Sequence, residues 1–202
     1  MSLLEEEELK RDRVRLLLDR WGLLSRPLLE REVPCLSWSR LLPAMRRMEL
    51  AGELMVGRFF GGINSLQFAS PRIAEELEEA EAERGIYWMN ATDPASPAGL
   101  DVQGILPEGT RRLASTRLCF RGAELLAISS RGGKDLAIFI SPDDPDIGEA
   151  LAFLKFPRTR RVQPENKIII EKINGKTAAA CAYFSALSAL GFVKDRGKMV
   201  LW

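Results

Sequence analysis

The sequence contains no histidine among its 202 residues. Histidine is the usual general base near neutral pH, the partner of serine and cysteine nucleophiles, and a frequent ligand of catalytic zinc. Its absence excludes the hydrolase mechanisms that depend on histidine. Catalysis by carboxylates or lysine remains possible.

Cysteine is also scarce, with only Cys35, Cys119 and Cys181, which lie far apart in the sequence. An odd number of cysteines without a Cys-x-x-Cys pair argues against a disulfide framework and against a zinc site. We expect each cysteine to be a small buried hydrophobic side chain in a reduced, cytoplasmic protein.

Long apolar segments are missing too. No run of about 18 or more apolar residues is present, so the sequence predicts no membrane span and no membrane partner. The chain starts with Met-Ser-Leu-Leu and four glutamates, and this acidic start is not a secretory signal. Because Met-Ser-Leu is typical of an expression scar, we expect the natural beginning to lie upstream.

The charge is nearly balanced overall but unevenly distributed. The sequence carries 29 Lys and Arg and 28 Asp and Glu, a net charge of +1. Residues 1–100 hold 13 basic and 17 acidic residues, and residues 101–202 hold 16 and 11, so the halves carry −4 and +5. This asymmetry does not by itself indicate a nucleic-acid partner.

The first half has the pattern of a winged helix. Apolar residues recur at helical spacing over residues 4–21, a short helix is expected over 27–32, and Ser37 begins a third helix that ends near Gly52 and contains Pro43. Two short strands, 53–60 and 66–69, flank a glycine-bearing turn. Three helices followed by a β-hairpin predict a winged-helix domain over residues 1–89, completed by a helix over 72–84.

Residues 90–110 are rich in proline, glycine and small polar residues, which is typical of a linker between domains. The second half has a different pattern. Strands are expected over 113–120, 124–129, 136–140, 167–173, 192–193 and 198–202, and helices over 147–156 and 178–190. The fold class is therefore α+β, a winged helix followed by an antiparallel sheet or partial β-barrel over 111–202.

Two segments resemble known motifs but lack essential parts of them. Gly175-Lys176-Thr177 is similar to the end of a P-loop, yet position 170 is isoleucine where that motif requires glycine, so a hairpin turn is favoured. Asp143, Asp144 and Asp146 could form a cation site, but Pro145 interrupts the spacing of a calcium loop. We interpret these aspartates as a turn that begins a helix.

Arginines in the first half are candidates for contacting DNA. A winged helix places its third helix in the major groove and its wing against the backbone. Phosphate contacts are therefore predicted for side chains on the third helix and the wing, namely Arg40, Arg46, Arg47 and Arg58. Ion pairing with the nearby Glu30, Glu32, Glu49 and Glu53 is the alternative, and winged helices also serve as protein-packing modules.

A second basic cluster follows the helix expected over 147–156. It consists of Lys155, Arg158, Arg160 and Arg161, and it is read equally well as a set of phosphate contacts or as solvated surface. Trp38 and Trp88 could stack on bases, but tryptophan more often belongs to a core.

Several segments together resemble the C-terminal region of large helicase-related (Lhr) DNA helicases. They include residues 21–32 (WGLLSRPLLERE), 38–54 (WSRLLPAMRRMELAGEL), 57–69 (GRFFGGINSLQFA), 91–100 (ATDPASPAGL), 170–176 (IEKINGK), 190–192 (LGF) and 196–201 (RGKMVL). The likeness covers nearly the whole chain in order. It implies an accessory module of a superfamily 2, ATP-dependent helicase of DNA repair with 3′-to-5′ polarity. Such a module guides DNA beside motor domains that lie upstream in the same chain.

The sequence has no complete Walker A or Walker B motif, so ATP and Mg²⁺ would belong to those motor domains, and we expect no cofactor, metal or catalytic residue here. Two alternatives remain open. A DNA-glycosylase-like winged-helix module would need a water-activating residue, for which Gln67 and Asp195 are the candidates. A pure protein-interaction module is the other.

Overall fold

The computed structural model describes residues 2–79, 85–100, 104–159, 161 and 164–202. The chain forms two compact units. The first contains Met1–Glu81 and Gly99–Glu108, and the second contains Ala82–Ala98 and Gly109–Trp202. The expected linker over 90–110 is therefore divided between the units, and the strand Ile86–Asn90 belongs to the second unit although we expected the first to extend to residue 89.

The helices of the first unit lie within a few residues of their predicted bounds, except that the predicted end of the last one, over residues 80–84, lies outside the described residues. They are α1 (Leu3–Trp21), α2 (Arg26–Leu29), α3 (Trp38–Leu50) and α4 (Pro71–Glu79). Ser2 and Glu5 form a capping box at the start of α1, and Gly22 ends the helix at a φ of 70° that glycine adopts without strain. Pro43 is accommodated within α3.

Three short strands complete the first unit: β1 (Leu23–Ser25), β2 (Met55–Gly57) and β3 (Gln67–Ala69). They form an antiparallel sheet in the order β1-β3-β2, with Leu24 opposite Phe68 and Val56 on its other side. The sequence did not predict β1. The order of three helices and a β-hairpin confirms the predicted winged helix, and we call residues 58–66, between β2 and β3, the wing.

The core of the first unit lies between α1, α2, α3 and the sheet. Its buried members recur every three or four residues along the helices, as an amphipathic helix requires. They include Val14, Leu17, Leu24, Leu29, Leu41, Met45, Met48 and Phe68. Leu100, from the second segment of this unit, also packs against this core.

The second unit is built on a six-stranded sheet in the order β10-β9-β7-β6-β5-β4. Its strands are β4 (Ile86–Asn90), β5 (Arg117–Arg121), β6 (Glu124–Ser130), β7 (Asp135–Ile138), β9 (Lys172–Ile173) and β10 (Lys176–Thr177). All neighbours are antiparallel except β7 and β9, which are parallel. The fold class α+β is thus confirmed, but this sheet is mixed rather than purely antiparallel.

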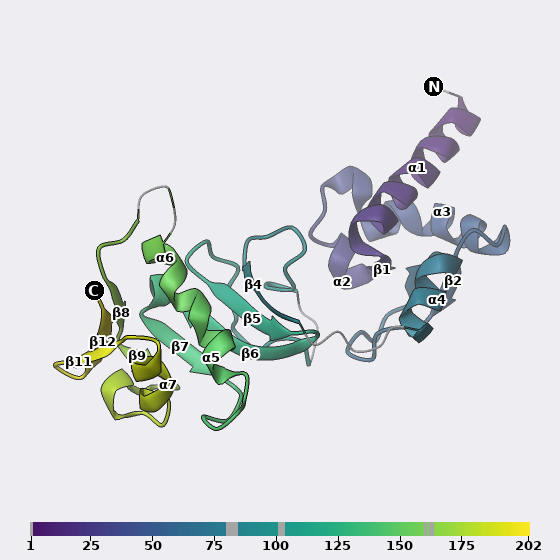
Figure 1. Cartoon of the computed structure of the whole chain (residues 1–202). Coiled ribbons are helices and arrows are strands. Elements are labelled where there is room, and N and C mark those ends of the chain that lie inside the picture. The colour runs from purple at the N-terminus through teal and green to yellow at the C-terminus, as the bar shows by residue number, and fades with distance from the viewer. Residues whose placement is uncertain (1, 80–84, 101–103, 160, 162–163) are drawn as a thin grey trace. The chain divides into compact units, whose positions relative to one another are not determined.

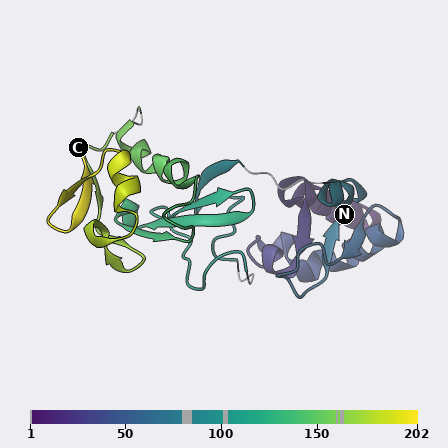
Figure 2. The ribbon, with the colours of Figure 1, turned by 60° about the horizontal axis from the view of Figure 1, so that its bottom comes forward.

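A second sheet, in the order β11-β12-β8, comprises β8 (Ile168–Ile170), β11 (Val193–Asp195) and β12 (Lys198–Leu201). The single strand expected over 167–173 is therefore wrong, because the chain leaves one sheet after Ile170 and enters the other at Lys172. The helix expected over 178–190 is also divided, into a 3₁₀ turn (Ala178–Ala180) and α7 (Phe184–Ala189). The C-terminal strands and α7 lie close together (Figure 2).

Helical segments cover one face of the larger sheet (Figure 1). They are α5 (Ile147–Ala152), a 3₁₀ turn (Phe153–Lys155) and α6 (Phe156–Thr159). Their buried residues Ala150, Leu151 and Leu154 join Cys119, Leu126 and other strand residues in the core of this unit. The helix predicted over 147–156 is confirmed, although a 3₁₀ turn replaces regular α-helix over residues 153–155.

Both segments that resemble other motifs are turns. Lys176 and Ile173 pair across a β-hairpin whose corner is Asn174 and Gly175, with φ values of 49° and 76°. This confirms the hairpin interpretation of Gly175-Lys176-Thr177. Arg121 forms ion pairs with Asp144 and Asp146 and so offsets part of the negative charge of this turn. Within the described part of the chain, no helix has the length and apolar character that crossing a membrane requires.

Candidate nucleic-acid interface

The outer face of α3 carries the arginines that the sequence indicates. Arg40, Pro43, Arg47 and Leu50 are exposed and follow one another at three- and four-residue spacing, while Arg46 lies beside them. The opposite face of α3 is buried in the core. The helix therefore presents a fixed row of cations to solvent.

Two of these three arginines already have acidic partners. Arg47 pairs with Glu7 of α1, and Nη1 of Arg46 lies 2.8 Å from a carboxylate oxygen of Glu49. The Arg46 guanidinium also lies 5.6 Å from the centre of the Phe68 ring, a cation–π distance. The ion-pair alternative thus applies to Arg46 and Arg47, and a phosphate would have to compete with a carboxylate for each.

Electrostatics strengthen the pairing between α1 and α3. Partial burial raises the pKa of Glu7, but hydrogen bonds from Lys10 and Arg47 more than offset this, so that its pKa is lowered. Glu7 is therefore ionised throughout the neutral range, and acidification would release Arg47.

Arg40 and Arg58 differ from these two. Arg40 lies on the first turn of α3 and Arg58 at the start of the wing, and both side chains are exposed. Among the described residues, neither makes a hydrogen bond or an ion pair. Exposed arginines without acidic partners are the side chains best able to bind phosphate oxygens. They are accordingly the strongest candidates in the first unit.

The wing is held to the sheet by Gln67, which is completely buried at the start of β3. Its Nε2 donates to the carbonyl oxygens of Phe60, at 2.7 Å, and Ile63, at 3.1 Å, and its Oε1 accepts from the Phe60 amide at 2.7 Å. These three hydrogen bonds fix the path of the wing, and hence the place where Arg58 enters it.

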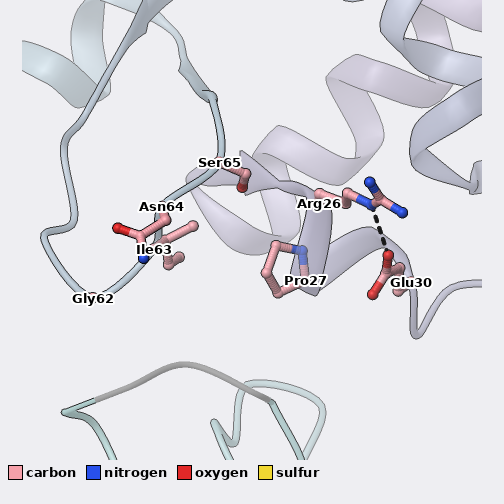
Figure 3. A pocket seen from close by; sticks show the side chains of 7 residues that line it. All are labelled: Arg26, Pro27, Glu30, Gly62, Ile63, Asn64 and Ser65. Atoms are coloured by element: carbon pink, nitrogen blue, oxygen red, sulfur yellow. Dashed lines mark hydrogen bonds and ion pairs between the residues drawn. The ribbon is translucent and has the colours of Figure 1, made fainter.

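A hollow of about 330 Å³ lies between α2 and the wing (Figure 3). It is lined by Arg26, Pro27, Glu30, Gly62, Ile63, Asn64 and Ser65. Arg26 and Glu30 form an ion pair at 2.8 Å on one side, and Asn64 and Ser65 lie on the other. Because its two charges cancel, the hollow does not select an anion.

The second basic group lies in the other unit. Lys155 is half-buried at the end of the 3₁₀ turn, and Arg158 and Arg161 are exposed. None of the three forms an ion pair among the described residues. Arg160 lies outside the described residues. The structure therefore divides the candidate residues between two units and gives each unit cations without acidic partners.

Aromatic rings lie directly beside this second group. Phe153 stacks on Trp88, with ring centres 4.9 Å apart, and on Phe156, with centres 5.3 Å apart. The Arg117 guanidinium lies 5.3 Å from the centre of the Phe153 ring. We call Trp88, Phe153 and Phe156 the aromatic stack. The sequence pointed to Trp88 alone, and the phenylalanines were missed because their spacing of three matched an ordinary helix face.

The structure also places the remaining residues that the sequence suggested as candidates. Trp38 packs against Phe68 in the first core, with ring centres 5.9 Å apart. The amide of Gln67 is occupied by the wing, and Asp195 is exposed on β11. Among the described residues, no group of three or more acidic or cysteine side chains is placed to hold a metal ion.

Comparison with known proteins agrees with this geometry. Residues 4–89 match the family model described as the winged-helix domain of large helicase-related proteins. The chain is 26% identical to the Lhr helicase/uracil glycosylase of Escherichia coli (strain K12) over 87% of its own length, and it spans 12% of the length of that relative. The resemblance found in the sequence is thereby confirmed: the first unit matches the winged-helix model of the large helicase-related (Lhr) family, and most of the chain is similar to an Lhr protein.

Proposed function

We propose that the chain is an accessory, DNA-contacting module of an ATP-dependent helicase in the DNA-repair class. The winged-helix unit binds the phosphate backbone non-specifically through Arg40 and Arg58, and Arg46 and Arg47 join once a phosphate displaces their carboxylates. The observation that carries this proposal is the pair of exposed arginines without acidic partners on α3 and the wing.

The proposed division of labour follows from what the chain contains. ATP and Mg²⁺ are assigned to motor domains elsewhere in the parent protein, because the chain's one P-loop-like segment is a β-hairpin. The chain itself then acts as a guide for nucleic acid in a cytoplasmic protein, with no catalytic residue of its own. Its partners are DNA and those motor domains.

A salt titration tests the DNA contact. Binding of the whole chain to a fluorescent DNA duplex is measured by anisotropy over a range of salt concentrations. Each phosphate contact contributes about 0.9 to the slope of log K against log salt, so Arg40→Ala and Arg58→Ala should each lower the slope by about that amount. Arg72→Ala is the control, because this exposed arginine on α4 is paired with Glu76. Binding that does not respond to salt contradicts the proposal.

Uracil excision is a second candidate, because the E. coli relative is named as a helicase and uracil glycosylase. The exposed Asp195 is the available carboxylate among the two residues considered, since the Gln67 amide is engaged by the wing. Incubation with a uracil-containing oligonucleotide should then produce an abasic product that Asp195→Asn abolishes. If no product forms and no DNA binds, association with the motor domains in a pull-down would favour the interaction module.

A further inference from the structure

The aromatic stack is anchored at its Trp88 end, which is partly buried, and open at the other. The indole Nε1 of Trp88 donates to the carbonyl oxygen of Ala150 at 2.8 Å, which fixes this ring against α5. Phe153 is half-buried and stacks on both Trp88 and Phe156. Its ring plane lies within 16° of each of the other two ring planes. Phe156 ends the stack and is 48% exposed. An ordered ring is therefore held at the surface by two others behind it.

The sequence next to Phe156 is rich in cations, although the chain returns beside it where the Glu165 amide donates to the carbonyl oxygen of Pro157 at 2.9 Å. Lys155 and Arg158 flank it in the sequence, Arg161 follows, and residues 153–161 contain no carboxylate. Arg117 adds a further cation over Phe153. Of the nearby carboxylates, Asp144 and Asp146 share the single positive charge of Arg121 with Glu124.

Single-stranded nucleic acid is the ligand that matches this combination. Proteins that bind it without sequence preference pair aromatic rings, on which bases stack, with cations that follow the phosphates. A DNA duplex has no unstacked base face to offer to Phe156. An apolar protein surface would gain no binding energy from the cations beside Phe156.

We propose that Phe156 is a stacking platform for an unpaired base of single-stranded DNA, with Lys155, Arg158 and Arg161 contacting the flanking phosphates. Trp88 and Phe153 are positioning residues, which hold the Phe156 ring in place. This site lies in the second unit and does not depend on the arginines of the winged helix.

The test uses the whole chain and two fluorescent probes of equal charge: an oligothymidylate of about ten nucleotides, and the same backbone with abasic sites. The unmodified chain should bind the thymidylate more tightly, because only that probe has bases. Phe156→Leu keeps an apolar contact with Phe153 but removes the aromatic face, and Phe156→Ala removes both. Loss of a base stack worth about 1–3 kcal/mol lowers affinity about 5- to 150-fold, so the preference for bases should largely disappear.

Phe139→Leu is the matched control, since Phe139 is 49% exposed and follows β7 outside the stack. It should leave both affinities unchanged, and near-ultraviolet circular dichroism checks that each variant is folded. Equal binding of the two probes by the unmodified chain overturns the proposal, and so does a preference for bases that survives in both Phe156 variants. Neither result affects the duplex contact, whose failure would appear separately in the Arg40 and Arg58 variants.

Discussion

Replacing Gln67 with leucine isolates the role of the buried amide beneath the wing. Leucine is close in size to glutamine and fits an apolar site, so the substitution removes hydrogen bonds without opening a large cavity. It leaves the Phe60 amide and the Ile63 carbonyl oxygen without their side-chain partner, whereas the Phe60 carbonyl oxygen still accepts from the Ile63 amide at 3.3 Å. Phe60 is partly exposed and water can replace some of its loss, whereas Ile63 is buried.

The expected effect follows from these contacts. Three hydrogen bonds at about 1 kcal/mol each, less the hydration that Phe60 regains, give a loss of about 2–3 kcal/mol in the free energy of unfolding. In urea, with an m-value of about 1–1.5 kcal/mol/M for a unit of this size, the midpoint should fall by about 2 M. Exchange of the Phe60 amide proton, followed by NMR, should become about tenfold faster or more.

Asn64→Ala is the control, because Asn64 is exposed in the same wing and its replacement should change stability by less than about 0.5 kcal/mol. The reasoning is refuted if Gln67→Leu unfolds at the same urea concentration as the unmodified chain and its Phe60 amide remains protected. That outcome would mean that the wing keeps its path without Gln67, and the residue would again be open to a role in chemistry.

Three further outcomes are expected. Glu7→Gln should strengthen duplex binding severalfold at low salt, because a phosphate no longer has to displace a carboxylate from Arg47, whereas Glu6→Gln, one residue earlier, should have a smaller effect. Burial, aided by the charge of Glu149, raises the pKa of Cys119 to about 12, so at pH 8 a thiol reagent should label the two partly exposed cysteines and reach Cys119 only after unfolding; labelling in the native state would contradict this. Asn174→Ala should lower the free energy of unfolding by about 2–3 kcal/mol in urea titrations, because it removes two hydrogen bonds to the last residue of β7 and places alanine at a φ of 49°. Asn174→Gly loses the same hydrogen bonds but adopts this φ without strain, so its loss should be smaller.

The winged helix was predictable because its boundaries are marked locally. Gly22 and Gly52 end helices at positive φ, and Ser70 with Pro71 begins α4. The strand β1 carries no such mark. It has three residues and exists because Leu24 finds Phe68 more than forty residues away, which no local pattern encodes.

The second unit shows the same limit. Ile168, Ile170 and Ile173 are all buried, and the spacing of three after Ile170 interrupts the alternation of a single strand. This break in the alternation of buried residues was the feature of the sequence from which the division into β8 and β9 could have been predicted. The parallel pairing of β7 with β9 depends on the whole topology and had no local signal.

The sequence identified which residue types form the candidate sites, but it did not show which side chains contact one another. The sequence supplied the arginines of α3 without showing that Arg47 meets Glu7, forty residues away. Likewise, Trp88 and Phe153 are 65 positions apart, so the aromatic stack emerged only from the fold. Local chemistry therefore identified candidates, and tertiary contacts decided which of them are free.

The division of the chain into units has a consequence for how it can be dissected. Residues 99–108 return to the first unit after the strand β4 has joined the second, and Leu100 completes the packing of the first core. A fragment that ends near residue 89 would lose this return segment and also carry β4 away from its sheet. Truncated variants and domain exchanges should therefore keep both units on one chain, because no single cut separates two complete cores.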